Sequence, residues 1–161
     1  MTAGKLTLSY EDVDLVDVVQ AAIETLRHAA DRKALTLGFG GEIALPRLRG
    51  DSKRLQQVVT NLLSNAIKFT PEGGRIAVTL GRENDTAILA VRDTGVGIDP
   101  TSLIKVFEPF HQVPHESTVP GLGLGLSIVH EIVAAHHGTV EAFSDGSGAG
   151  ATFVVTLPLS S

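Results

Sequence analysis

The sequence of 161 residues lacks cysteine altogether and has few aromatic residues, which make up 4% of the chain. Without cysteine it can form neither a disulfide nor a thiolate metal site, and this suits a reducing cytosol. No apolar run approaches the roughly 20 residues that a membrane-spanning helix needs. No basic leader precedes an apolar stretch, so no secretory signal is visible. We therefore expect a cytoplasmic domain without direct membrane contact.

Basic residues are also scarce, because 13 Lys and Arg stand against 18 Asp and Glu, for a formal net charge of -5. Binding to a nucleic-acid backbone needs clustered Lys and Arg, so nucleic acid is not expected as the main partner. Glycine, in contrast, is abundant, with 17 residues that fall mostly after Gly73. Glycine-rich loops let the backbone approach a ligand closely. A bound polyanion would be held by backbone amides, one or two cations and a metal.

The hydrophobic pattern predicts one domain over residues 1–161, with its core at about 10–159. Three long helices are expected: one after the capping residues 12–14, one after the capping residues 51–52 that is stopped at 70–71, and one from Leu124 to His137 with Gly138 as its C-cap. Strands are expected at 35–39, 75–80, 86–92, 139–143 and 151–157, with a turn at 81–85, a leader or short edge strand at 1–9, and a short helix at 101–106. This is an α+β fold, in which helices cover one face of a mixed, mostly antiparallel sheet of about five strands.

A polar stripe follows the second of these helices. At 3.6 residues per turn, Asn61, Asn65 and Lys68 lie within about 60° of one another. The amide oxygen of Asn65 is a hard ligand that Mg²⁺ accepts alongside water and phosphate. Lys68 can reach a phosphate as a point charge. The alternative is an ordinary solvated helix face that happens to carry two amides.

Glycine motifs follow at two further places. Asp93 stands at the end of a strand, where its carboxylate can accept a hydrogen bond from an adenine amino group, and Gly95 and Gly97 leave room for the ring. An ordinary Asp-Thr-Gly turn is the alternative. Residues 121–126 lead into the third helix, whose first amides suit a phosphate, although a flexible hinge has the same composition. Leu126 replaces the third glycine of a dinucleotide fingerprint, and no P-loop lysine is present.

Between these motifs, residues 99–120 contain four prolines and little periodicity. They predict a lid that folds over a bound nucleotide and excludes water, with Phe107 and Phe110 as apolar anchors. A disordered connection is the alternative.

In this order, the motifs resemble those of the catalytic ATP-binding domain of sensor histidine kinases, in the gyrase/Hsp90/histidine kinase/MutL (GHKL) superfamily. Residues 61–70 match the N box, 93–98 the first glycine box, 107–112 the F box, 121–126 the second glycine box and 148–153 the last glycine-rich box. The resemblance covers the chain from about Asp12 onward. It implies a Bergerat-type two-layer α/β sandwich with an ATP lid at about 99–120.

The resemblance also implies roles for single residues. Asn65 would coordinate Mg²⁺, Asn61 would help hold the metal–phosphate cluster, and Lys68 would contact phosphate; these are the candidate catalytic residues. Asp93 would bind the adenine amino group directly and through water, with Thr152 supporting the water network. The remaining implied ATP contacts are Phe69 beside the adenine, Gly95, Gly97, Gly121, Gly123 and Gly125 in the pocket walls, the backbone of Leu122 and Leu124, and Ile98 and Phe107.

The implied function is the kinase module of a two-component sensor. It would bind Mg–ATP and transfer the γ-phosphoryl group to a histidine on a separate dimerisation domain, for onward transfer to a response-regulator receiver domain. None of the six histidines has the sequence setting of a phosphoacceptor, so the acceptor domain is expected outside this chain, and the isolated domain is expected to be monomeric.

Three other functions are alternatives to the histidine kinase module. A GHKL ATPase carries a general-base Glu where this chain has Asn61, whose amide cannot accept that proton. A serine-directed anti-sigma kinase fits the N, F and second glycine boxes less well. A nucleotide-binding scaffold without transfer activity is favoured by the lid segment 114–120, which contains His115 but no Arg or Lys.

Overall fold

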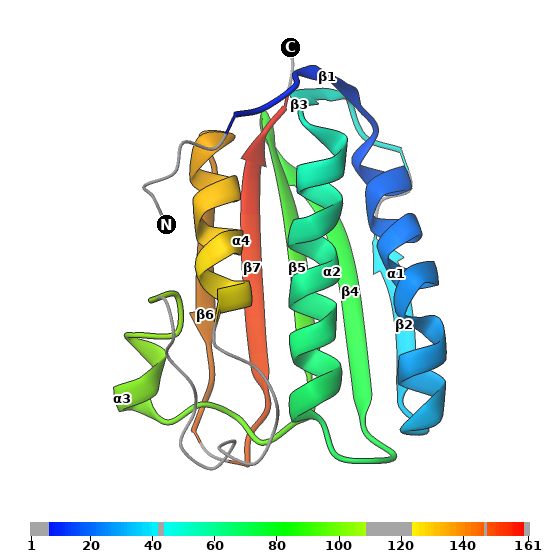
Figure 1. Ribbon diagram of the computed structural model, residues 1–161, viewed down its shortest axis with the longest axis vertical. Helices are drawn as coiled ribbons and strands as arrows, with labels where there is room; N and C mark the ends of the chain where they lie inside the picture. The colour runs from blue at the N-terminus through cyan, green and yellow to red at the C-terminus, as the bar shows by residue number, and fades with distance from the viewer. Residues whose placement is uncertain (1–6, 42–43, 109–123, 147, 160–161) are drawn as a thin grey trace.

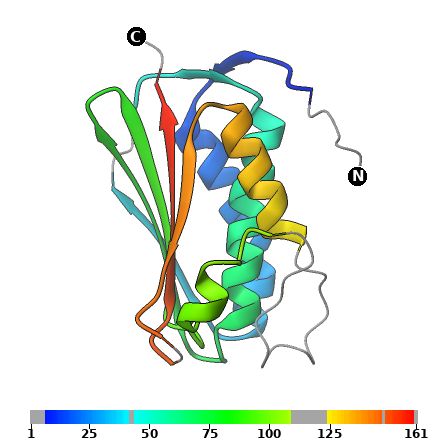
Figure 2. The same ribbon diagram turned by 90° about the vertical axis from the view of Figure 1, so that its left-hand side faces the viewer.

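An open five-stranded sheet forms one layer of the molecule, and helices form the other (Figure 1). The structure is a computed structural model that describes residues 7–41, 44–108, 124–146 and 148–159. Figure 2 shows that the three long helices all lie on the same side of the sheet. The expected α+β sandwich is therefore confirmed.

The strand order in the sheet is β2-β4-β5-β7-β6. Only β2 pairs in parallel, with β4, and every other pairing is antiparallel. Buried and exposed side chains alternate along β4, β5 and β7, as expected for a sheet with one covered face. The bounds of the strands are Thr36–Gly41 for β2, Arg75–Glu83 for β4, Thr86–Asp93 for β5, Thr139–Phe143 for β6 and Ala151–Pro158 for β7.

The helices begin where the sequence offers a capping side chain. Asp14 caps α1 (Leu15–Arg32) and Asp51 caps α2 (Ser52–Phe69), each by accepting backbone N–H bonds of the first turn. Both helices carry an apolar stripe that is buried against the sheet. The other helices are α3 (Pro100–Leu103), shorter than the expected 101–106, and α4 (Leu124–Ala135). Among the described residues, no helix combines the length and the apolar character that crossing a bilayer requires.

The sequence patterns do not predict two short strands. β1 (Glu11–Val13) and β3 (Leu48–Gly50) form a separate antiparallel pair above the N-terminal end of α2. The expected edge strand at 1–9 is wrong for residues 7–9, which form no strand, and residues 1–6 lie outside the described part. Three residues are too few to show the alternation that identifies a strand.

Two turns differ from expectation in their details. The β4–β5 hairpin turns at Asn84, which has a positive φ of 55°, while Gly81 lies within β4. At the end of α4, His137 and not Gly138 adopts the left-handed conformation, with φ of 65°. Gly138 donates its N–H to the carbonyl of Val133, as in a Schellman motif. It has to be glycine because a β-carbon there would collide with the carbonyl oxygen of Thr156.

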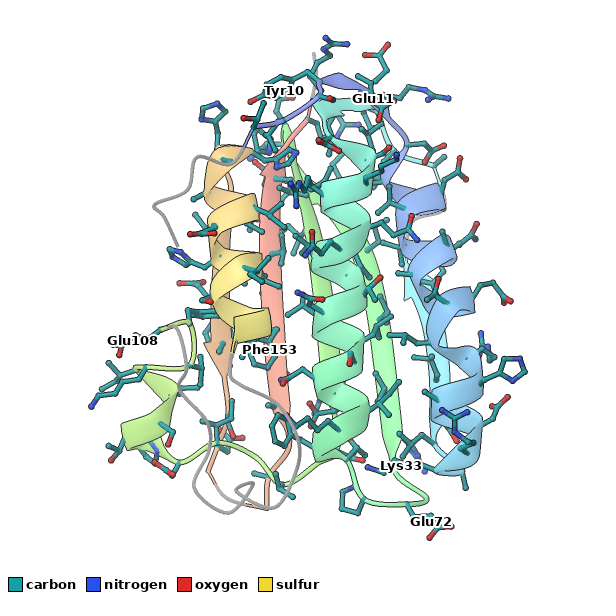
Figure 3. All side chains as sticks on the ribbon, viewed as in Figure 1. Tyr10, Glu11, Lys33, Glu72, Glu108 and Phe153 are labelled. Atoms are coloured by element: carbon teal, nitrogen blue, oxygen red, sulfur yellow. The ribbon has the colours of Figure 1, made fainter. Side chains whose placement is uncertain are left out.

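The buried side chain of His136 links the C-terminal end of α4 to the N-terminal end of α2. The Nε2 atom of His136 accepts the backbone N–H of Asp51 at 3.0 Å, and Nδ1 lies 2.8 Å from the carbonyl oxygen of Ile132. The ring of Tyr10 packs edge-on against the imidazole, at the upper end of the molecule in Figure 3. His136 is therefore held as the neutral Nδ1–H tautomer, and it satisfies an N–H group at the start of α2.

We expect His136→Leu to destabilise the fold by about 1–3 kcal/mol, because the buried N–H of Asp51 would lose its acceptor. Urea unfolding measures the change, and His28→Leu on the exposed face of α1 is the matched control. Equal unfolding midpoints for the two variants would contradict a stabilising role for this hydrogen bond.

Candidate nucleotide-binding site

The centre of the candidate site is the buried carboxylate of Asp93, the last residue of β5. Its Oδ1 atom accepts the backbone N–H of Gly95 at 2.8 Å and that of Ala151 at 3.2 Å. Among the residues that the structure describes, no donor reaches Oδ2. Burial raises the pKa of Asp93, although the two N–H bonds oppose this shift. The carboxylate is thus fixed by one oxygen and offers the other to a ligand.

The loop after Asp93 packs against the C-terminal end of α2. Val96 donates its N–H to the carbonyl of Phe69 at 3.1 Å. A β-carbon on Gly95 would collide with that same carbonyl oxygen, so only glycine fits there. The packing places the predicted adenine acceptor directly beside the end of the helix that carries Lys68.

The β6–β7 loop closes this region from the other side. Ser144 donates its hydroxyl to the carbonyl of Gly150 at 2.7 Å, and its oxygen accepts the N–H of Ile98 at 3.0 Å. Gly150 donates to the carbonyl of Gly95 at 3.1 Å. A β-carbon on Gly97 would collide with the carbonyl oxygen of Gly146. These contacts hold the first glycine box and the last one together as a single unit.

Helix α2 presents the predicted polar stripe. The amide nitrogen of Asn61 donates to the carbonyl of Gly125 at 3.2 Å, which ties the helix to the start of α4. Asn65 is half-buried. The ammonium of Lys68 lies 5.2 Å from the centre of the Phe69 ring, within reach of a cation–π interaction. The N box and the second glycine box therefore meet at Asn61.

A lysine that the sequence analysis missed fixes the C-terminal end of α2. Lys33, just after α1, donates from Nζ to the carbonyl of Ile67 at 2.7 Å and to that of Lys68 at 3.4 Å (Figure 3). An ammonium at this end satisfies orphan carbonyls and complements the helix dipole. Neither Lys33 nor Ser144 belongs to a recognisable motif, so only the three-dimensional structure identifies them.

Phe107 lies where the F-box expectation places an anchor. Its ring is half-buried and packs edge-on against Phe153 of β7, with the ring centres 6.1 Å apart. It also contacts the ring of His130 on α4, at 5.8 Å. The segment that follows α3 is therefore anchored on the core at the point where the described residues end.

One predicted residue is not brought to the site. In the β5–β7 pairing, Ala151 stands opposite Asp93, and Thr152 stands opposite Arg92. Because successive strand residues point to opposite faces, Thr152 lies on the open face of the sheet, away from Asp93. The backbone N–H of Ala151 contacts the carboxylate instead.

Other predicted residues fall outside the described part of the chain. These are Phe110, His115, the lid from 109 to 120, and Gly121, Leu122 and Gly123. Leu124 is described only as the first residue of α4. Among the described residues, no group of three or more acidic or histidine side chains is placed to hold a metal.

Comparison with known proteins agrees with this arrangement. A family model described as histidine kinase-, DNA gyrase B-, and HSP90-like ATPase (HATPase_c) matches residues 50–161. The sensor histidine kinase TmoS of Ectopseudomonas mendocina is 39% identical over 165 residues, which cover 99% of this chain and 16% of TmoS. The mycobacterial sensor histidine kinase MprB is 31% identical with a TM-score of 0.81, over 93% of this chain and 97% of that one. Full-length ShkA in complex with AMPPNP is 30% identical with a TM-score of 0.85, over 98% of this chain and 33% of ShkA.

The fold and the site define a nucleotide-binding α/β sandwich. The chain belongs to the family of histidine kinase-, DNA gyrase B- and HSP90-like ATPases, and within it to the ATP-binding kinase modules of two-component sensors. It spans only 16% of the length of TmoS.

We expect Asp93→Asn to be at least as stable as the wild type at neutral pH, because it removes a buried charge and keeps an oxygen for both N–H donors. Since the folded pKa of Asp93 is raised above the ordinary value of 3.8, the wild type loses stability as pH rises through that pKa, and the variant does not. The stability difference should therefore widen with rising pH. Chemical denaturation between pH 4 and 8 measures it.

Asp99→Asn is the control. The N–H of Ser102 lowers the pKa of Asp99 below its ordinary value of 3.8, so the stability that this carboxylate gives is lost only at pH below the measured range, and the stability gap of Asp99→Asn should stay constant between pH 4 and 8. A stability gap that does not change with pH for Asp93→Asn would contradict the burial argument.

Proposed function

We propose that the chain binds Mg–ATP in the space bordered by α2, the loop after β5 and the start of α4. The observation that carries this proposal is the Oδ2 atom of Asp93, a buried acceptor for which the described residues supply no donor. A buried acceptor without a partner is costly. The amino group of adenine supplies the missing donor, and Gly95 leaves the backbone bare beside the ring.

The polar stripe of α2 would hold the phosphate end. Lys68 would contact phosphate oxygens, Asn65 would supply an oxygen ligand to Mg²⁺, and Asn61 would support the cluster from the edge shared with α4. The first backbone amides of α4, at the positive end of its dipole, suit phosphate as well. These residues orient the nucleotide and neutralise charge, which is the protein's main contribution to phosphoryl transfer.

The proposed reaction is transfer of a phosphoryl group to a histidine on a separate dimerisation domain, which would then pass it to a response-regulator receiver domain. ATP supplies the γ-phosphoryl group, and Mg²⁺ supplies positive charge beside the phosphates. The similarity to sensor histidine kinases supports the class of reaction. The module would act in the cytoplasm, where ATP is available.

The environment of Asn61 favours transfer over hydrolysis. A hydrolase of this superfamily needs a carboxylate base at this position, and an amide cannot take the proton of water. The amide nitrogen of Asn61 already donates to the carbonyl of Gly125, so this side chain ties two helices together. The nucleophile would then have to come from a partner domain. His136, which is buried and bonded through both ring nitrogens, is not available as an acceptor.

We expect Mg²⁺ to no longer strengthen ATP binding in Asn65→Ala, because the metal loses its protein oxygen ligand. The dissociation constant for Mg–ATP should therefore rise at least about tenfold. Titration calorimetry with ATP, with and without Mg²⁺, measures this. Ser64→Ala is the matched control, because Ser64 is the exposed neighbour on the same helix. An unchanged dissociation constant for Asn65→Ala would remove this residue from the site.

The transfer step is tested by mixing the chain with a histidine-bearing dimerisation domain of a sensor kinase and Mg–ATP labelled on its γ-phosphate. Acid-labile, base-stable label on the partner is the expected result. Tight nucleotide binding without any labelling would instead favour the scaffold function, and label released only as inorganic phosphate would favour a hydrolase.

A further inference from the structure

The N-terminal half of α2 carries a second group of polar residues, beyond the candidate phosphate contacts. Lys53, Gln57 and Thr60 continue the stripe of Asn61 towards the N-terminal end of the helix, at spacings of three and four residues. Together with Gln56 and Asn61 they line a shallow surface depression of roughly 340 Å³. We refer to Lys53, Gln57 and Thr60 as the upper α2 surface.

Charge sets this helix apart from the rest of the molecule. The 18 residues of α2 contain Lys53, Arg54 and Lys68 but no Asp or Glu, so all 18 carboxylates of the chain lie elsewhere. The carboxylates nearest to the start of the helix are engaged. Asp51 accepts the N–H groups of Arg54 and Ser9, and Glu11 accepts the hydroxyl of Ser52. Lys53 itself is exposed.

The polar groups of this surface are mainly donors. Arg54 donates to the Oε1 atom of Gln57 at 3.3 Å, and among the described residues no acceptor reaches the amide N–H groups of Gln57. The ammonium of Lys53 adds three donors one helical turn away. A surface of this kind fits carboxylate groups.

The position of the upper α2 surface relates it to the proposed reaction. Asp93 lies at the C-terminal end of α2, where Val96 bonds to Phe69, so a nucleotide bound there runs along the stripe towards Asn61. From Lys68 to Asn61 the helix rises by about 10 Å, and from Asn61 to Lys53 by a further 12 Å or so. In the proposed complex, the upper α2 surface would therefore begin beyond Asn61, next to the terminal phosphate.

We infer that the upper α2 surface docks a carboxylate-bearing face of the histidine-bearing dimerisation domain and so brings the acceptor to the end of the phosphate chain. This inference rests on the proposed function and adds to it the residues that recognise the partner. Lys53 and Gln57 act as positioning residues that touch the partner and leave the nucleotide untouched.

The test uses Lys53→Glu, with Arg32→Glu as the control. Both are exposed cations on long helices, and Arg32 lies in the last turn of α1. A Glu in the first turn of α2 is compatible with the helix dipole, so the variant should fold. Three quantities are measured for each protein: the dissociation constant for Mg–ATP, the affinity for a histidine-bearing dimerisation domain with AMPPNP or without nucleotide, and the KM for that domain during transfer.

We expect Lys53→Glu to weaken partner binding and raise this KM by about three- to tenfold, with a reduced salt dependence. The dissociation constant for Mg–ATP should change by less than about twofold, and Arg32→Glu should match the wild type. Replacing an acidic residue of the partner by Lys should restore binding to the Lys53→Glu variant.

Two results would overturn the inference. One is equal partner affinity for Lys53→Glu and Arg32→Glu, and the other is a parallel loss of Mg–ATP affinity in Lys53→Glu, which would assign the surface to the nucleotide. A wild-type chain that binds no Mg–ATP refutes the proposed function instead, and partner binding without nucleotide then still decides whether this surface docks the domain.

Discussion

The site depends on one backbone contact, the hydrogen bond from the N–H of Val96 to the carbonyl of Phe69. It joins the last turn of α2 to the loop after β5, two segments that come from different layers of the sandwich. Gly95 permits the contact, because any β-carbon would collide with the same carbonyl oxygen. Since Asp93 and Lys68 each lie within three residues of this contact, their relative position is set by rigid elements, as precise binding requires.

Helix α2 is also held at both of its ends by side chains from its neighbours. At the N-terminal end, His136, which directly follows α4, accepts the N–H of Asp51, and at the C-terminal end Lys33 donates to the carbonyls of Ile67 and Lys68. Helix ends are where backbone groups lack partners within the helix, so these contacts satisfy groups that would otherwise be costly to bury. The tie between Asn61 and Gly125 fixes the middle of the helix. Helix α2 thus serves as a rigid support for the candidate nucleotide-binding residues.

Most of the fold and the centre of the site could be predicted from the sequence, because they rest on local patterns. The buried stripe from Leu55 to Ile67 has helical spacing, and the glycines after Asp93 mark close backbone approach. The failures come from long-range pairing. The motif assigns Thr152 to the adenine side, but the register of β5 with β7 places Ala151 beside Asp93. No sequence pattern fixes that register, and Lys33 and Ser144 act through contacts with residues far along the chain or in another loop.

The burial of the Asp93 carboxylate lowers stability, and the proposed role in ligand binding accounts for its position. Burial raises the pKa of this carboxyl, which means that its ionised form is less favourable in the folded state than in water. Two backbone N–H groups offset part of the cost, but both are directed at Oδ1. An apolar residue could fill a site on the covered face of the sheet with less penalty. A carboxylate kept there, with one oxygen fixed and one open, makes sense when a ligand donor completes its hydrogen bonding, and binding then restores stability that the empty fold gives up.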